Sequence, residues 1–154
     1  MTKTRVRYDP RQNNFGNPES SRPNNLFLHY QQPAYKAAVD DEHRPEFPFV
    51  SSFEFTNACN LDCVFCARQV MTRKNGLMSE ALMHKIMAEF SQRNIFLKVN
   101  GYGENLLHPQ ALDFIRLIKK TNGLYFTTNA TLIDDKVAEC FVETGLDVVQ
   151  LSFQ

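Results

Sequence analysis

The sequence has no tryptophan, few cysteines and no excess of charge of either sign. Its 154 residues contain 17 Lys and Arg against 17 Asp and Glu, so the formal net charge is zero. Balanced charge gives no electrostatic footprint for binding DNA or RNA. No apolar run is long enough to cross a bilayer, and the basic residues of 1–10 precede no apolar segment of the signal-peptide type. We therefore expect a cytoplasmic protein that binds neither nucleic acid nor membrane.

The composition is that of a globular protein, with 43% hydrophobic and 22% charged residues. The length suits one ordinary domain. Four cysteines are too few for a disulfide scaffold at this size. Three of them fall between residues 59 and 66. In a cytoplasmic chain, such crowding indicates metal or redox chemistry.

The chain divides near residue 48. Six of the seven prolines lie in 1–48, where no helical or strand period persists. We expect residues 1–48 to form an irregular N-terminal arm and residues 49–154 to form the folded core. The core pattern stops on a strand with no helix after it, so we also expect the 154-residue chain to be a fragment.

Short strands alternate with amphipathic helices through the core. Strands are predicted at 49–56, 95–100, 124–128 and 147–153. Ser79 and Asp134 are predicted to cap two helices, and Pro109 suits the first turn of another. We expect the first helix to bury Leu82, Ile86 and Phe90. Alternation of this kind predicts an α/β fold with a parallel sheet, whose active site lies at the carboxyl ends of the strands.

Cys59, Cys63 and Cys66 form a C-x3-C-x2-C run directly after the first predicted strand. Three thiolates on one loop can converge on a soft metal centre. A structural zinc site usually takes four ligands, and Cys140 falls on the apolar side of a predicted helix. Three thiolates therefore suit an iron–sulfur cluster with one open iron. Other interpretations are a thioredoxin-like Cys63/Cys66 pair, a zinc site completed by His84 or His108, or unreactive thiols.

This cysteine motif, with Phe65 before its last cysteine, resembles the radical S-adenosylmethionine (radical SAM) superfamily. The resemblance covers about residues 48–154 and implies a partial (β/α) barrel, here truncated after its fourth strand. It implies that Cys59, Cys63 and Cys66 bind a 4Fe–4S cluster whose fourth iron is chelated by SAM. An external electron donor such as flavodoxin or ferredoxin then drives cleavage of SAM to methionine and a 5′-deoxyadenosyl radical. The radical abstracts hydrogen from a substrate.

The resemblance also assigns residues that follow the strands to SAM. Gly103 and Glu104 match the glycine–glutamate motif, whose glutamate contacts the SAM amino group. Asn129 and Ser152 match polar positions that contact the SAM ribose or carboxylate, and Phe65 would pack near the adenine. Three positions depart from the family pattern: Asn105 for Pro, which we expect to loosen the turn, Ala130 for Gly, and Gln154 for Asp.

Each assignment has a plainer alternative. Glu104, Asn129 and Ser152 can be ordinary turn or strand residues, and Phe65 can be a core aromatic. At the level of the whole chain, the alternatives are a non-catalytic binding module stabilised by zinc or a cluster, and a thiol oxidoreductase using Cys63 and Cys66. The Gly101–Pro109 segment resembles a branch that includes peptide-modifying enzymes, which implies a peptide or protein substrate.

Overall fold

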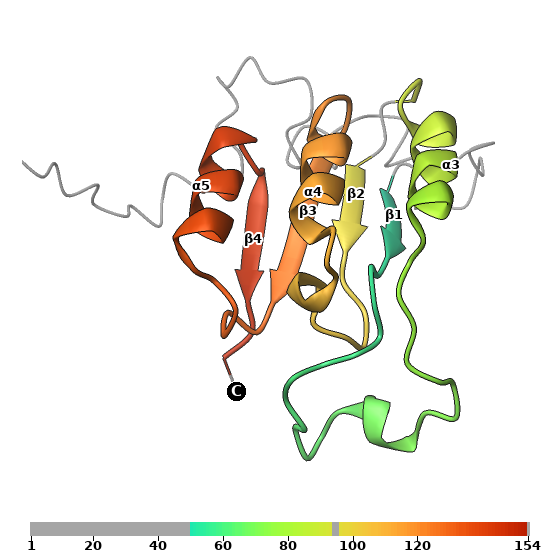
Figure 1. Cartoon of the computed structure of the whole chain (residues 1–154), viewed down its shortest axis with the longest axis vertical. Coiled ribbons are helices and arrows are strands. Elements are labelled where there is room, and N and C mark those ends of the chain that lie inside the picture. The colour runs from blue at the N-terminus through green and yellow to red at the C-terminus, as the bar shows by residue number, and fades with distance from the viewer. Residues whose placement is uncertain (1–49, 94–95, 154) are drawn as a thin grey trace, which may run out of the picture.

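A computed structural model describes residues 50–93 and 96–153, and the predicted arm 1–48 lies outside the described residues. Four parallel strands form one sheet in the order β1-β2-β3-β4. The strands are β1 (Val50–Phe53), β2 (Phe96–Val99), β3 (Gly123–Thr128) and β4 (Val148–Leu151). The connecting helices are α3 (Glu80–Phe90), α4 (Ala111–Lys119) and α5 (Asp135–Glu143). Figure 1 shows this alternation, which confirms the predicted α/β class with a parallel sheet.

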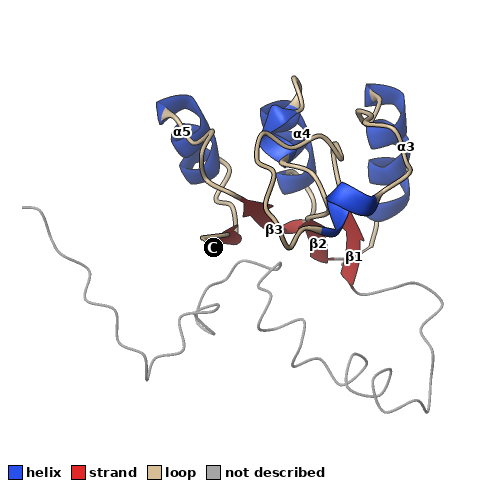
Figure 2. Ribbon diagram, turned by 90° about the horizontal axis from the view of Figure 1, so that it is seen from below, coloured by secondary structure: helices blue, strands red, loops and turns tan. Residues whose placement is uncertain are grey.

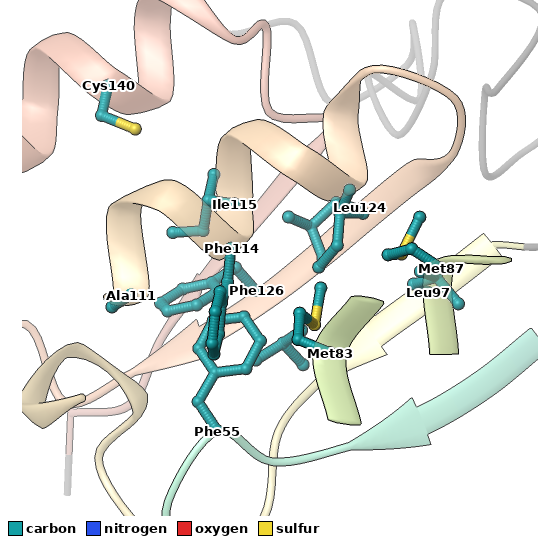
Figure 3. Packing of buried hydrophobic residues seen from close by; sticks show 12 residues of the cluster. Phe55, Met83, Met87, Leu97, Ala111, Phe114, Ile115, Leu124, Phe126 and Cys140 are labelled. Carbon is teal, nitrogen blue, oxygen red and sulfur yellow. The ribbon is translucent and has the colours of Figure 1, made fainter. Parts of the chain in front are cut away.

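The three helices lie on the same side of the sheet (Figure 2). The hydrophobic core fills the space between the helices and the sheet (Figure 3). It includes Phe55, Leu97 and Phe126 on the sheet side and Phe114 and Ile115 on α4. Phe55 packs edge-on against Phe114, with ring centroids 5.3 Å apart. This core fixes the strands, and therefore their carboxyl ends, in one register.

Two helix starts follow the predicted caps, whereas α4 begins at Ala111 after the N-cap Gln110, so Pro109 precedes its first turn instead of occupying it. The Ser79 hydroxyl accepts a hydrogen bond from Leu82 N at 3.2 Å, and the Asp134 carboxylate accepts one from Val137 N at 2.9 Å. Each bond satisfies one of the backbone donors left free in a first helical turn. Short polar residues before an apolar period therefore located both helices correctly.

The predicted buried face of α3 is wrong at Leu82, although Phe90 packs against the core and Ile86 is half-buried. Leu82 is 46% exposed, whereas Met83 and Met87 are 0% and 5% exposed. Apolar side chains occupy two adjacent rows of this helix, and a spacing of four fits both rows equally. Packing against the sheet selects the row that contains the two methionines.

The fourth strand carries apolar side chains that are not covered by a helix. Leu151 is 44% exposed, and Phe153, just after the strand, is 78% exposed. Asp147 fixes the start of this strand, because its carboxylate pairs with Lys119 and accepts a hydrogen bond from Leu124 N at 2.8 Å. Within the described parts of the chain, none of the helices has the length and apolar character needed to span a membrane.

Candidate functional site

The carboxyl ends of the four strands meet at one edge of the sheet, at the bottom of Figure 1. The loop that carries the three adjacent cysteines leaves β1 at this edge. The segment Gly101–Glu104 follows β2, Asn129 follows β3, and Ser152 follows β4. Parallel pairing thus gathers the predicted site residues from four separate stretches of sequence.

Side chains at the end of β1 close the base of the cysteine loop, residues 58–76. Asn57 donates from its amide nitrogen to Lys74 O at 3.0 Å, and its amide oxygen accepts from Gly76 N at 2.7 Å. The Thr56 hydroxyl donates to Gly76 O at 2.7 Å. Asn57 and Thr56 are only 4% and 2% exposed, so these bonds are shielded from water. The loop therefore leaves and re-enters the fold at a fixed point.

Gly103 allows two of the loops to touch. A Cβ placed on Gly103 would lie 2.1 Å from Thr56 O and 2.6 Å from Ala58 O, both of which are backbone atoms. The next residue, Glu104, donates its backbone N–H to Ala58 O at 2.8 Å. A glycine in such a motif can let the backbone approach a ligand closely. In the structure, its missing side chain lets the backbone approach the segment just before Cys59.

The Glu104 side chain joins the β2 and β3 ends of the site. One carboxylate oxygen accepts from the Thr128 hydroxyl at 2.9 Å and from Leu106 N at 3.1 Å, and the other accepts from Asn129 N at 2.7 Å. Glu104 is 2% exposed. A buried carboxylate needs compensating donors, and here three donors from the chain supply them. The predicted contact between this carboxylate and the SAM amino group stays a prediction.

Asn105 joins the same junction through its amide oxygen, whereas its amide nitrogen is buried without a hydrogen-bond partner among the described residues. The expectation that Asn105 loosens the turn stays a prediction. Its amide oxygen accepts a hydrogen bond from Phe55 N at 2.8 Å, and the side chain is 1% exposed. Proline, the residue expected here, has no side-chain acceptor for this backbone N–H. Asn105 therefore ties the segment leading from β1 into the cysteine loop to the turn that begins with Glu104.

Asn129 lies against the cysteine loop. Its amide nitrogen donates to Asn60 Oδ1 at 2.9 Å and lies 3.9 Å from Cys59 Sγ. Asn60 in turn donates to the Thr131 hydroxyl at 2.8 Å. The next residue after Asn129, Ala130, has a φ of 66°, in the left-handed region that favours glycine. The family-like turn is therefore formed even though Ala130 replaces glycine.

The three loop cysteines are free and partly exposed, whereas Cys140 is free and buried. Within residues 50–93 and 96–153, no three His, Cys, Asp or Glu side chains are arranged to hold a metal ion, so the structure does not bring the three sulfurs together. Arg68, which the sequence analysis did not assign, supports this loop by donating to Leu61 O at 2.8 Å and to Asp62 at 3.0 Å. Burial raises the pKa of the Cys140 thiol, and the nearby Arg116 partly offsets this rise.

The remaining candidates differ in exposure. Phe65 is 64% exposed, so it is not a core aromatic in this structure. The Ser152 backbone N–H donates to Thr128 O at 2.9 Å, so Ser152 lies beside the end of β3, which Asn129 follows. His108 is 4% exposed, and its ring accepts from Gln110 N at 3.1 Å and lies 2.8 Å from Met78 O. With both ring nitrogens engaged, His108 does not suit the alternative zinc site.

A cavity of about 520 Å³ opens beside the ends of β1 and β2. Its lining includes Glu54, Arg73, Asn100 and Tyr102. Glu54 is paired with Arg73 and accepts a hydrogen bond from Tyr102 N at 2.8 Å. Phe53 and Met71 add apolar surface to the lining. The cavity therefore has mixed walls, in which the charges of Glu54 and Arg73 are matched, and it lies next to the glycine–glutamate segment.

Comparisons with known proteins agree with this arrangement. The family model described as the radical SAM superfamily matches residues 53–154, and the chain belongs to this superfamily. A tungsten-containing aldehyde ferredoxin oxidoreductase cofactor-modifying protein from Pyrococcus furiosus is 34% identical over 64% of this chain and 29% of its own length. A GTP 3′,8-cyclase from Chlorobaculum tepidum is 34% identical over 63% of this chain and 30% of its own length. The chain thus spans about a third of the length of these curated relatives.

The fold also matches a solved structure. A crystal structure of BtrN in complex with AdoMet and 2-DOIA aligns with a TM-score of 0.62 and 21% identity, over 69% of this chain and 46% of that one. At this identity the match supports the fold alone. Members of the radical SAM superfamily use a 4Fe–4S cluster and SAM.

The residues of this site fit both groups chemically. Three free thiols on one loop supply three soft ligands, and the remaining cysteine, Cys140, is buried in α5. Thiolates are the usual protein ligands of iron–sulfur clusters. The cavity at the ends of β1 and β2 and the backbone groups of Gly101–Glu104 lie beside this loop. This donor set fits a cluster with one iron that has no protein ligand.

Proposed function

We propose that this chain is the part of a radical SAM enzyme that binds a 4Fe–4S cluster and SAM. The observation that carries the proposal is the junction of three loops at the carboxyl edge of the sheet. The cysteine loop, the glycine–glutamate segment and the Asn129 turn are joined there by Glu104 and Asn129. Residues that hold a reactive group must be fixed relative to one another. This junction fixes Glu104, Asn129 and the start of the cysteine loop at Cys59.

In this proposal Cys59, Cys63 and Cys66 are the cluster ligands. Held by these thiolates, the cluster would supply the one-electron reduction that cleaves SAM to methionine and a 5′-deoxyadenosyl radical for hydrogen abstraction from the substrate. The external electron donor supplies that electron. Cys59 is held in advance because its neighbour Ala58 is bonded to Glu104. Cys63 and Cys66 lie further along the loop, where Arg68 holds the chain at Leu61.

SAM is proposed to lie across the ends of the strands, in contact with the Gly101–Glu104 segment, Asn129 and Ser152. Phe65 is exposed and free to cover the adenine. Glu104 serves the site through the loops that its carboxylate joins, since that carboxylate is buried and already accepts three hydrogen bonds. Gly103 keeps the segment that carries Glu104 against the base of the cysteine loop.

The relative from Chlorobaculum tepidum is named for a reaction of GTP, whereas the Gly101–Pro109 segment resembles peptide-modifying members. The substrate we propose is a peptide or protein, on that resemblance. The cleavage of SAM is common to both kinds of substrate and is the step to test first.

The test is electron paramagnetic resonance of the anaerobically reconstituted, reduced chain with and without SAM. Coordination of SAM to the open iron should change the spectrum, and chromatography should detect 5′-deoxyadenosine and methionine in equal amounts. The variant with Cys59, Cys63 and Cys66 all replaced by Ala is the control and should show no cluster signal. A cluster whose spectrum is unchanged by saturating SAM would contradict the proposal.

A further inference from the structure

Of the three loop cysteines, Cys59 is the one whose sulfur accepts hydrogen bonds within the described residues. Leu61 N donates to Cys59 Sγ at 3.4 Å, and Asn129 Nδ2 approaches the same sulfur at 3.9 Å. Leu61 belongs to the cysteine loop itself, but Asn129 comes from the end of β3, 70 residues away in sequence. The contact to Asn129 therefore depends on the fold as a whole.

The orientation of the Asn129 amide follows from its other partners. Its oxygen accepts from Thr131 N at 3.0 Å and from the Thr131 hydroxyl at 2.7 Å. A backbone N–H can only donate, so the oxygen must face Thr131 and the NH₂ group must face the cysteine loop. One N–H of this group is directed to Asn60 Oδ1 at 2.9 Å, which leaves the other for Cys59 Sγ.

Both ends of this contact are held by Glu104. Its carboxylate accepts from Asn129 N at 2.7 Å, and its backbone N–H donates to Ala58 O at 2.8 Å, next to Cys59. The donor amide and the accepting sulfur are thus attached to one buried residue. This attachment fixes the donor and the acceptor to the same part of the fold.

We propose that Asn129 is a positioning residue for the cluster. Its side-chain N–H donates a hydrogen bond to the Cys59 thiolate, and this bond raises the reduction potential of the cluster. The inference rests on the proposed function, because it takes Cys59 as a cluster ligand. Reduction adds negative charge that is shared with the thiolate sulfurs. A donor directed at one of these sulfurs stabilises the reduced form more than the oxidised form. The role is additional to the SAM contact that the sequence motif implies for Asn129.

The test is a potentiometric titration of the reconstituted full chain, followed by electron paramagnetic resonance, without SAM. Omitting SAM removes any effect of Asn129 on SAM itself. Asn129→Ala should lower the equilibrium constant for one-electron reduction about tenfold, which is about 59 mV. Thr131→Val is the matched control, since it removes a hydroxyl from the same network and leaves the bond to sulfur. Thr131→Val should change the equilibrium constant for reduction less than about twofold, which is far smaller than the tenfold change, about 59 mV, expected for Asn129→Ala.

A second pair of variants separates the hydrogen bond from charge. Asn129→Asp keeps the acceptor for Thr131, loses the donor and adds a negative charge, whereas Asn60→Asp adds the same charge without removing that donor. The potential should fall further in Asn129→Asp than in Asn60→Asp. If Asn129→Ala does not assemble a cluster, this pair provides the comparison.

Two failures are distinguishable. A wild-type chain that assembles no cluster overturns the proposed function. A wild-type cluster whose potential is matched by both Asn129 variants overturns the inference and leaves the proposed function standing.

Discussion

The backbone N–H of Asn129 lies 2.7 Å from a carboxylate oxygen of Glu104, and both residues belong to the buried junction between the β2 and β3 ends of the site. The same carboxylate accepts from Leu106 N and from Thr128. The junction therefore depends on a side chain that accepts at both of its oxygens.

Glu104→Gln should destabilise the fold by about 1–3 kcal/mol, because either orientation of the new amide leaves one buried backbone N–H facing another donor. Urea unfolding of the cluster-free chain measures this change. Glu139→Gln, on an exposed position of α5, is the control and should stay within about 0.5 kcal/mol. Equal effects of the two substitutions would show that the Glu104 carboxylate does not hold the junction.

Gly103→Ala should also destabilise the fold, by about 1–3 kcal/mol. The alanine Cβ would collide with backbone atoms, which cannot move away by a change of rotamer as a side chain could. Gly76→Ala is a matched control in the same region, because a Cβ there meets nothing within 4 Å. Thermal or urea unfolding of both variants provides the comparison. If Gly103→Ala and Gly76→Ala change the free energy of unfolding equally, the Gly103 backbone does not pack closely against Thr56.

Ala130→Gly should stabilise the fold by about 0.5–1 kcal/mol. The left-handed backbone at Ala130 costs an L-residue about 1–2 kcal/mol, and the greater freedom of glycine in the unfolded chain cancels part of the gain. Ala138→Gly, within α5, should instead cost about 1 kcal/mol. Opposite signs in denaturant unfolding are the expected result, and a loss of stability in both variants would contradict the turn geometry.

Cys140 should react with iodoacetamide far more slowly than the three loop cysteines in the metal-free, reduced chain. It is 0% exposed, and burial raises its pKa above the ordinary 9.0, so less of its thiol is ionised at pH 8. A neutral buried thiol contributes stability below pH 9 that is lost as pH rises through the higher folded pKa.

Peptide mass spectrometry after timed alkylation measures the rate at each cysteine. Denatured chain, in which all four cysteines should react alike, is the control for intrinsic reactivity. Alkylation of Cys140 in the folded chain as fast as that of Cys59 would contradict its burial.

Local signals in the sequence predicted some of this structure well. Ser79 and Asp134 cap helices because a short polar side chain needs only the next turn of its own helix. The row of α3 that packs inward was not predictable, because Leu82 and Met83 lie on adjacent rows with the same period. The sheet decides between those rows, and its position depends on residues far away in sequence.

The site shows the same division. The order of motifs and strands predicted that the cysteine loop and the Gly103 segment lie at the same edge of the sheet, where the structure places them. The hydrogen bond from Phe55 N to Asn105 could not be predicted, since it joins residues 50 positions apart. The contact of Asn129 with Cys59 joins residues 70 positions apart and was missed for the same reason. Only the paired strands bring such residues together.

The central claim is that Cys59, Cys63 and Cys66 hold a 4Fe–4S cluster, and metal analysis after anaerobic reconstitution tests it most directly. Iron, inorganic sulfide and zinc are measured in the wild-type chain, in each single Cys→Ala variant of the loop and in Cys140→Ala. We predict iron and sulfide in equal amounts in the wild type and in Cys140→Ala, and loss of both in every loop variant. Stoichiometric zinc without sulfide, a redox-active dithiol without metal, or equal loss of iron in Cys140→Ala would contradict the claim.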